Sequence, residues 1–372
     1  MLDYFFFLFC FLSVFKIQIK GFDDFFSDYM NLSNTSSIKG IFVWLIIFHH
    51  KSDYRNYNNC IYKKITGNLG TKLVSMFLYY SGFGIYESLK SKGSNYPNSL
   101  LIKAFILFLK FQIIILMFLL TNIFVLQKKI LLKEYLLSTI FRASLGNSNW
   151  FAFTIIILYC YSFLSFRFIK NKIYLGIIII SFICILHIKF IYKYYYPNLN
   201  MAVDNILCFI IGFYFSFMKR NLDKIIMKND ICYFFSISII IFIYYKTILI
   251  RNLIYDSISN ALFAIIIVFI SMKVKFNNDF LLFLNSHSYS IYLLQRIVMI
   301  ITYKKKIFNN SEFIQVSFEF SSIFFIASLF DKCTKFLDIL FKILNGYSKK
   351  VNYMAINNKS LNKFIDINVS EK

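Results

Sequence analysis

The chain has 372 residues, 58% of them hydrophobic and only 16% charged, and a mean hydropathy of +0.62. A soluble domain of this length does not combine so much apolar sequence with so few charges, so the composition excludes a water-soluble globular fold. The formal charge of +23 does not indicate nucleic-acid binding, because the cations lie mostly between apolar runs, at headgroup level.

About eleven apolar segments have the composition of membrane-spanning helices. A span needs about 20 mostly apolar residues, and its backbone must be helical. In chain order the segments are Tyr4–Ile19, Ile38–His50, Thr71–Leu89, Ser99–Val125, Trp150–Phe166, Ile173–Ile191, Val203–Met218, Ile231–Ile250, Asn260–Met272, Phe280–Tyr303 and Phe313–Phe330. Leu131–Leu145 is shorter and amphipathic, and is predicted to be a surface or re-entrant element. The fold class is therefore all-α, a polytopic integral membrane protein with about 10-11 transmembrane helices.

The chain divides into an extra N-terminal transmembrane segment and linker (1–36), one membrane domain (37–345) and a polar C-terminal tail (346–372). The first segment lacks a basic n-region and a small-x-small cleavage site, so we expect it to be retained. Counts of Lys and Arg in alternate loops favour a cytoplasmic tail and an outer N-terminus. This orientation places His50 nearer the outer face.

The cysteines and histidines do not predict a metal site or a disulfide framework. The seven cysteines show no Cys-x-x-Cys spacing and lie mostly in apolar runs, as small packing residues do. Of the four histidines, His187 and His287 have no His or Cys at ligand spacing.

Lys39 and His50 are the residues that best indicate chemistry. They are eleven residues apart, close to three helical turns, so both side chains lie on one helix face, about 16 Å apart along the axis. Ionisable groups at a membrane edge are costly and often functional. A His with a pKa near neutrality can take a proton from a hydroxyl and return it. An interfacial His that bonds headgroups or a neighbouring helix is the alternative, and these residues alone favour neither reading.

The segment Ser37–Asp53 resembles the first core helix of the membrane-bound acyltransferase-3 family, whose signature is Arg or Lys, ten residues and then His. Three later stretches, Phe77–Gly93, Ile206–Asn221 and Leu284–Ile300, are similar to further helices of the family. The matching residues there are Ser81, Gly82 and Phe83, then Phe209 and Gly212, and finally Ser290, Ile291, Tyr292 and Leu293, with Gln295 at a position often held by His or Gln. The resemblance covers about 37–330, and its specific motif is the Lys/His spacing.

Members of this family move an acyl group, usually acetyl, from acyl-CoA to a hydroxyl of a cell-envelope glycan or lipid. The resemblance implies an O-acyltransferase in the cytoplasmic membrane of a bacterium, modifying a cell-surface polysaccharide or glycolipid. It implies acetyl-CoA as the donor substrate, a lipid-linked sugar or envelope glycan as acceptor, and no permanently bound cofactor. His50 would be the catalytic base and Lys39 would position or neutralise a negative group. With His50 near the outer face, acyl-CoA on the cytoplasmic side would have to reach across the membrane to it.

Several other residues are weaker candidates for substrate binding. CoA carries phosphate charges and needs a cationic entrance. Lys103 and Lys110 share a helix face, and Arg142 and Arg296 interrupt other apolar stretches. Snorkelling to headgroups is the alternative for each cation. Ser81, Tyr292 and Gln295 fall in matching motifs, with helix packing as the alternative.

Asp53 follows His50 by three residues and could orient its ring as a carboxylate partner; an exposed loop carboxylate is the alternative.

Two other functions compete with the enzyme. A transporter or flippase of lipid-linked glycans would also be polytopic and basic, but such proteins often carry Gly- or Pro-broken helices in paired halves, and this chain has two prolines and no visible duplication. A glycan polymerase would be expected to have a large outer loop with several Arg, which this sequence lacks.

Overall fold

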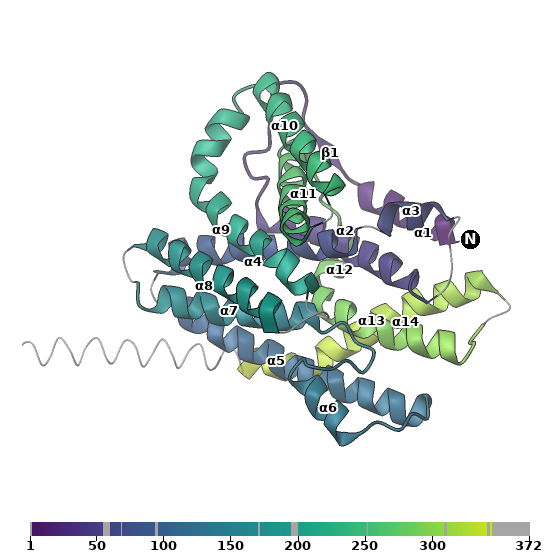
Figure 1. Cartoon of the computed structure of the whole chain (residues 1–372). Helices are drawn as coiled ribbons and strands as arrows, with labels where there is room; N and C mark the ends of the chain where they lie inside the picture. Colours follow the sequence, from purple (N-terminus) through teal and green to yellow (C-terminus); the bar gives the residue numbers. More distant parts are fainter. Residues whose placement is uncertain are drawn as a thin grey trace, which may run out of the picture.

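The computed structural model describes residues 2–54, 60–67, 69–93, 96–169, 172–194, 200–250, 252–308, 311–340 and 343. The predicted polar tail, 346–372, lies outside these residues. Figure 1 shows that the described chain is built almost entirely of helices. The helices are α1 (Leu2–Val14), α2 (Leu32–Lys51), α3 (Ile61–Thr66), α4 (Gly70–Lys92), α5 (Tyr96–Leu120) with the π-helical turn η2 (Thr121–Val125), α6 (Leu132–Thr139), α7 (Trp150–Arg167), α8 (Ile173–Tyr194), α9 (Asn200–Ile226), α10 (Asp230–Leu249), α11 (Leu253–Lys273), α12 (Asp279–Ser286), α13 (Ser288–Lys304) and α14 (Glu312–Cys333).

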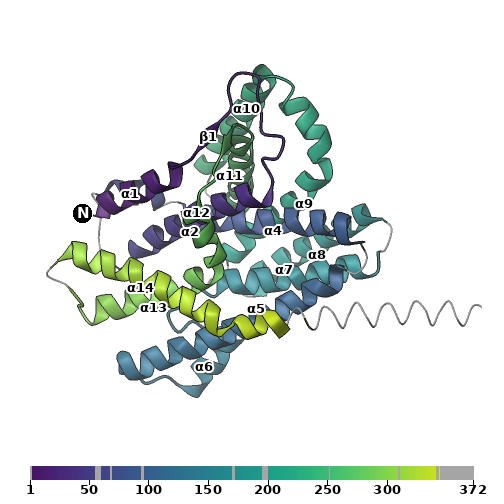
Figure 2. The same cartoon turned by 180° about the vertical axis from the view of Figure 1, so that it is seen from behind.

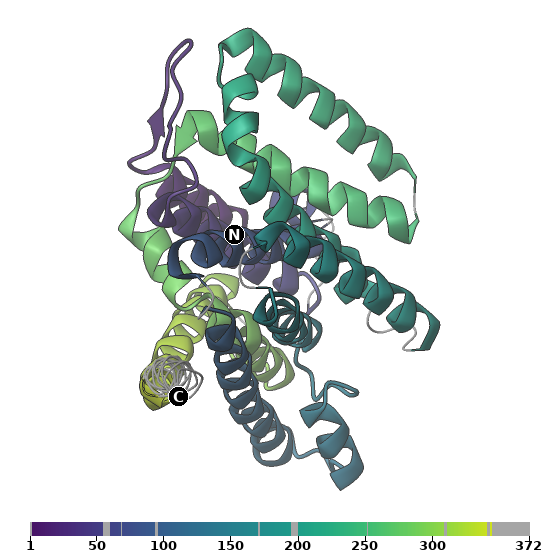
Figure 3. The ribbon, with the colours of Figure 1, turned by 90° about the vertical axis from the view of Figure 1, so that its left-hand side faces the viewer.

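Six helical stretches in the described chain are long and apolar enough to cross a bilayer. They are Tyr96–Val125, Trp150–Arg167, Ile173–Phe190, Asp230–Leu249, Ile254–Lys273 and Glu312–Cys333. On α10, large apolar side chains such as Phe235 and Phe242 are 69% and 62% exposed, which suits hydrocarbon and not water. Figure 3 shows α10 and α11, in green, side by side at the edge of the molecule. The protein is an all-α polytopic integral membrane protein.

Two predicted spans differ from the helices that form. The first helix ends at Val14, not at Ile19, because Gln18–Ile19 (β1) pairs antiparallel with Val274–Lys275 (β2). Its 13 residues make a helix of about 20 Å, shorter than the hydrocarbon core of about 30 Å. The predicted span Phe280–Tyr303 is two helices, α12 and α13, that meet at His287.

The N-terminal helix packs on the same body as the rest of the described chain. It contacts α2, α12 and α14 (Figure 2), and its Phe6 and Phe9 rings lie 5.5 and 5.7 Å from the Trp44 ring of α2. The Trp44 indole N–H donates to Ser13 Oγ at 2.9 Å. The α1 helix therefore buries one side of α2, the helix that carries Lys39 and His50.

Glycines let the central helices approach one another closely. A Cβ on Gly82 of α4 would lie 2.1 Å from the Phe209 carbonyl oxygen of α9, and one on Gly212 would lie 2.2 Å from that of Tyr79. A Cβ on Gly40 would likewise lie 2.2 Å from the Leu281 carbonyl oxygen of α12. Small residues at membrane helix contacts commonly serve this purpose. Gly82, Phe209 and Gly212, which match the family pattern, thus form the α4–α9 contact.

Candidate functional site

One face of α2 lines a cavity in the centre of the helical body. Lys39, Val43 and Ile46 line it, at spacings of four and three residues. Helical residues at these spacings share a face. His50 is the next residue of the same series, one turn beyond Ile46. The cavity therefore runs along α2 from Leu32 past Lys39 to Ile46, and it ends one helical turn before His50.

The cavity has a volume of about 400 Å³ and is lined mainly by apolar and aromatic side chains. Its other walls come from α4, α5, α7, α12 and α13. Five tyrosines contribute: Tyr80, Tyr96, Tyr159, Tyr289 and Tyr292. Largely apolar pockets with a few polar groups are the usual form of small-molecule sites.

Two lysines line this cavity. They are Lys39 from α2 and Lys103 from α5. Within the described part of the chain neither forms an ion pair; the Lys103 ammonium lies 5.4 Å from the centre of the Tyr96 ring, as in a cation–π contact. Both side chains are half-buried, and a half-buried cation without a carboxylate carries a desolvation cost. An anionic ligand would remove that cost at this end of the cavity.

The Tyr80 hydroxyl is a further polar group of the wall. The side chain is only 7% exposed, and its hydroxyl has no hydrogen-bond partner among the described residues. Buried hydroxyls in native proteins are nearly always bonded. Tyr80 is therefore suited to bond a molecule held in the cavity.

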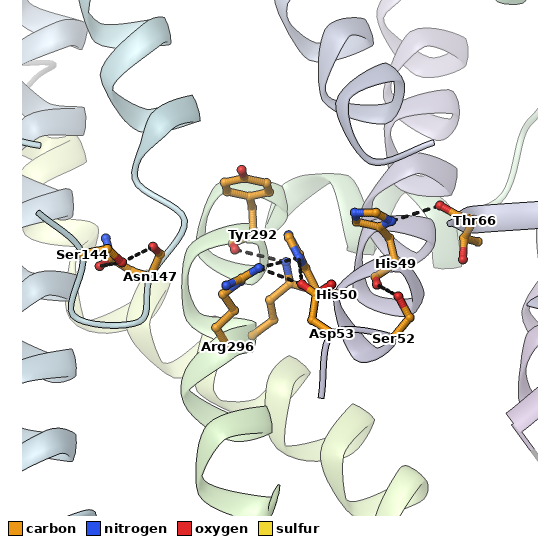
Figure 4. A network of polar contacts seen from close by, with 10 residues as sticks. His49, His50, Ser52, Asp53, Thr66, Ser144, Asn147, Tyr292 and Arg296 are labelled. Atoms are coloured by element: carbon orange, nitrogen blue, oxygen red, sulfur yellow. Dashed lines mark hydrogen bonds and ion pairs between the residues drawn. The ribbon is translucent and has the colours of Figure 1, made fainter. Parts of the chain in front are cut away.

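His50 faces α13 and belongs to a three-residue polar cluster, shown in Figure 4. Its Nδ1 lies 3.0 Å from an Arg296 guanidinium nitrogen and 3.4 Å from an Asp53 carboxylate oxygen. Arg296 also donates to that carboxylate oxygen at 2.9 Å. The His50 ring lies 6.4 Å from the ring of Tyr292, which lines the cavity. His50 does not itself line the cavity; it lies directly behind this tyrosine.

The carboxyl of Asp53, in the turn after α2, is held ionised. Partial burial opposes its ionisation, but the hydrogen bond with His50 and the positive charge of Arg296 outweigh it, so the pKa of Asp53 is lowered. An ionised Asp53 can accept from a protonated Nδ1 and leave Nε2 free to act as a base. When Arg296 donates to Nδ1 instead, the proton lies on Nε2. The cluster thus couples the tautomer of His50 to the position of Arg296.

Neighbouring residues fix the end of α2. Nδ1 of His49 bonds the Thr66 carbonyl at 3.0 Å, which holds α2 against the C-terminal end of α3 (Figure 4). Lys51 donates to Glu319 of α14 in an ion pair whose side chains are 6% and 4% exposed. The turn that carries His50 is therefore tied to two other parts of the chain.

The remaining sequence candidates divide into two groups. Ser81 and Tyr292 line the cavity, although the Ser81 hydroxyl donates to the Phe77 carbonyl of its own helix. Gln295 is buried beside the cluster, and its amide nitrogen donates to the Tyr292 carbonyl. Lys110 and Arg142 do not line the cavity.

Lys110 and Arg142 lie in other surroundings. The Lys110 side chain is 13% exposed and pairs with Asp338 at 2.9 Å. Arg142 is exposed in the turn that follows α6. Of the four cations that the sequence offered for CoA contact, Lys103 lines the cavity with Lys39, and Arg296 lies in the His50 cluster.

The sequence did not indicate that five tyrosines line the cavity, or that Lys51 is the partner of Glu319. Tyr80 and Tyr96 are two among 27 tyrosines, so only the packing singles them out. Charged residues inside apolar runs were the available signal for Arg296 and Glu319. That signal does not reveal which helix supplies the partner.

Comparison with known proteins gave no match: no protein-family model, no curated protein and no solved structure is significantly similar to this chain. A functional hypothesis therefore rests on the residues and geometry described above.

Proposed function

We propose that this protein is an integral membrane O-acyltransferase of the cytoplasmic membrane of a bacterium, transferring an acyl group, in the first place acetyl, from acyl-CoA to a hydroxyl of a cell-surface polysaccharide or glycolipid. One observation carries the proposal. A single face of α2 runs from Lys39, along the cavity, to the polar cluster of His50. This arrangement supports a cationic donor site in the cavity and a proton-accepting site behind Tyr292, both on one face of α2.

The donor is assigned to the end of the cavity that holds Lys39 and Lys103. CoA phosphates would pair with these ammonium groups. On the orientation predicted from the loop cations, both residues lie toward the cytoplasm, where acyl-CoA is found, and His50 lies toward the outside. The acyl chain would then point along the cavity to His50.

His50 is assigned the role of general base. Its Nε2 would take the proton of the acceptor hydroxyl as that oxygen attacks the thioester carbonyl, and would pass the proton to the departing CoA sulfur. Asp53 would hold the required tautomer by accepting from Nδ1. Tyr292, which lies between His50 and the cavity, would have to turn aside for the acceptor to enter.

The test is envelope glycan analysis in a deletion strain complemented with wild type, His50→Ala or His187→Gln. His187 serves as control because it is a part-buried histidine that bonds Tyr161 at 2.7 Å, away from the cavity. We expect O-acetyl groups to return with wild type and His187→Gln but not with His50→Ala, at equal membrane abundance. Full acylation with His50→Ala would refute the proposal; stalled glycan export in the deletion strain would favour the transporter.

A further inference from the structure

A second polar cluster lies where the α12–α13 break meets α14. His287 Nδ1 lies 2.5 Å from Asp331 Oδ2, and Ser328 Oγ lies 3.4 Å from His287 Nε2. The carboxylate and the hydroxyl thus contact opposite nitrogens of one imidazole. This is the order in which an acid, a histidine and a serine are placed in nucleophilic catalysis.

Local structure explains why the three side chains converge. His287 is the residue between α12 and α13, at the point where the helix is interrupted. Ser328 and Asp331 are three residues apart on α14, and therefore on one face. Ser290 of α13 donates to the other oxygen of Asp331. The ring of Phe283 packs against the imidazole, with 5.0 Å between centroids. Both the carboxylate and the ring are held in place.

In the tautomer that donates Nδ1–H to Asp331, the lone pair of Nε2 is directed at the Ser328 hydroxyl. The side chains of His287 and Asp331 are 20% and 24% exposed, and Ser328 is partly exposed. A small electrophile can therefore reach the serine.

We propose that Ser328, His287 and Asp331 form a second catalytic centre, an esterase site separate from the His50 cluster, with Ser328 as the nucleophile. The surroundings identify the substrate class. Phe325 and Leu329, on either side of Ser328, are 69% and 49% exposed on a helix apolar enough to span the bilayer. Side chains of this kind contact acyl chains. The substrate is the carboxylic ester of a membrane amphiphile.

The reaction balances with water as the second reactant. Ser328 Oγ bonds to the ester carbonyl carbon while its proton moves to His287 Nε2. The bond from that carbon to the alkoxy oxygen breaks, and the Nε2 proton leaves with the alcohol. Water then attacks the acyl-serine, again giving a proton to Nε2, and the fatty acid departs as Ser328 recovers its proton.

The purified full-length protein in detergent is treated with a fluorophosphonate probe, and the adduct is located by mass spectrometry of the wild-type protein. Hydrolysis of 4-nitrophenyl butyrate is measured in parallel. We expect the adduct on Ser328. Ser328→Ala and His287→Gln should lower the hydrolysis rate by roughly 100-fold or more, the scale of general-base catalysis.

Ser286→Ala is the matched control, since this exposed serine of α12 donates only to the Phe283 carbonyl among the described residues. It should keep both labelling and hydrolysis, and an adduct located on Ser328 separates this centre from the proposed acyltransferase site at His50. An unlabelled wild-type Ser328, or hydrolysis unchanged in Ser328→Ala, would overturn the proposal. Because the adduct is mapped on the wild type, a variant that folds poorly does not decide the outcome.

Discussion

Arg296 and Asp53 meet at 2.9 Å although 243 residues separate them in the chain. The contact joins the turn after α2 to the middle of α13, and His50 Nδ1 lies 3.0 Å from the Arg296 guanidinium and 3.4 Å from the Asp53 carboxylate. One ionised carboxylate and one permanent cation therefore control the hydrogen bonding of a single imidazole. The function proposed for His50 depends on that control.

Asp53→Asn is expected to lower the acyl-transfer rate by roughly 100-fold, because an amide can donate to Nδ1 and stabilise the wrong tautomer. The rate constant at saturating donor should fall, and the KM for acyl-CoA should stay near the wild-type value. Asp338→Asn, which removes an exposed carboxylate that pairs with Lys110 outside the cavity, is the control and should retain acyl transfer. An Asp53→Asn protein of normal activity would remove Asp53 from the mechanism.

The lowered pKa of Asp53 also predicts a pH dependence of stability. A carboxyl whose pKa is lower in the folded than in the unfolded protein stabilises the fold above its unfolded pKa of about 4, and this stabilisation is lost as pH falls through the folded pKa. The melting temperature of wild type should therefore exceed that of Asp53→Asn at pH 7. The difference should shrink as the pH falls below about 4 and vanish below the folded-state pKa of Asp53. A constant difference across this range would contradict an ionised Asp53.

Lys39→Gln and Lys103→Gln are expected to raise the KM for acyl-CoA by about 10- to 100-fold each, since a hydrogen bond to a charged group contributes roughly 1.5–3 kcal/mol. Lys110→Gln is the matched control, as it removes a cation from the same helix as Lys103 but outside the cavity. Titration of acyl-CoA in a detergent-solubilised assay measures the three values. If Lys110→Gln had the largest effect, the donor would bind elsewhere.

Gly212→Ala is expected to destabilise the protein by about 1–3 kcal/mol, because the added methyl group overpacks the contact between α9 and the backbone of α4. Its Cβ would meet the Tyr79 carbonyl oxygen at 2.2 Å, and backbone cannot move aside as a side chain can. Gly84→Ala is the control, because a Cβ there meets nothing within 4 Å. Thermal unfolding in detergent compares them. Equal stability of the two variants would show that α4 and α9 are less closely packed than described.

Lys51→Met is expected to cost about 3–5 kcal/mol, because it leaves the buried Glu319 carboxylate without its partner. The double variant Lys51→Met with Glu319→Leu should recover much of that loss, since apolar residues of similar volume often replace a buried ion pair at little cost. Unfolding of both variants in detergent gives the comparison. A double variant as unstable as the single one would mean that the pair is not buried.

Hydropathy and periodicity along the chain were enough to determine the fold class and most helix positions. The predicted segments Thr71–Leu89, Trp150–Phe166 and Phe313–Phe330 lie inside α4, α7 and α14. The transfer of apolar residues from water to hydrocarbon is favourable residue by residue, so it can be summed along the sequence without knowing any contact. The shared face of Lys39 and His50 was also predictable, because it depends only on helical repeat.

Only the tertiary structure decided which residues meet. Helix packing brought Lys103 to the cavity of Lys39 and left Lys110 outside it, and it joined Arg296 to Asp53 across 243 residues. It also brought Ser328 and Asp331 to His287, at a break inside a segment predicted as one span. Such pairings depend on the order and tilt of packed helices. Inside a bilayer every apolar helix satisfies its own backbone hydrogen bonds and is equally favoured by hydropathy. Hydropathy therefore cannot determine which helices pack together.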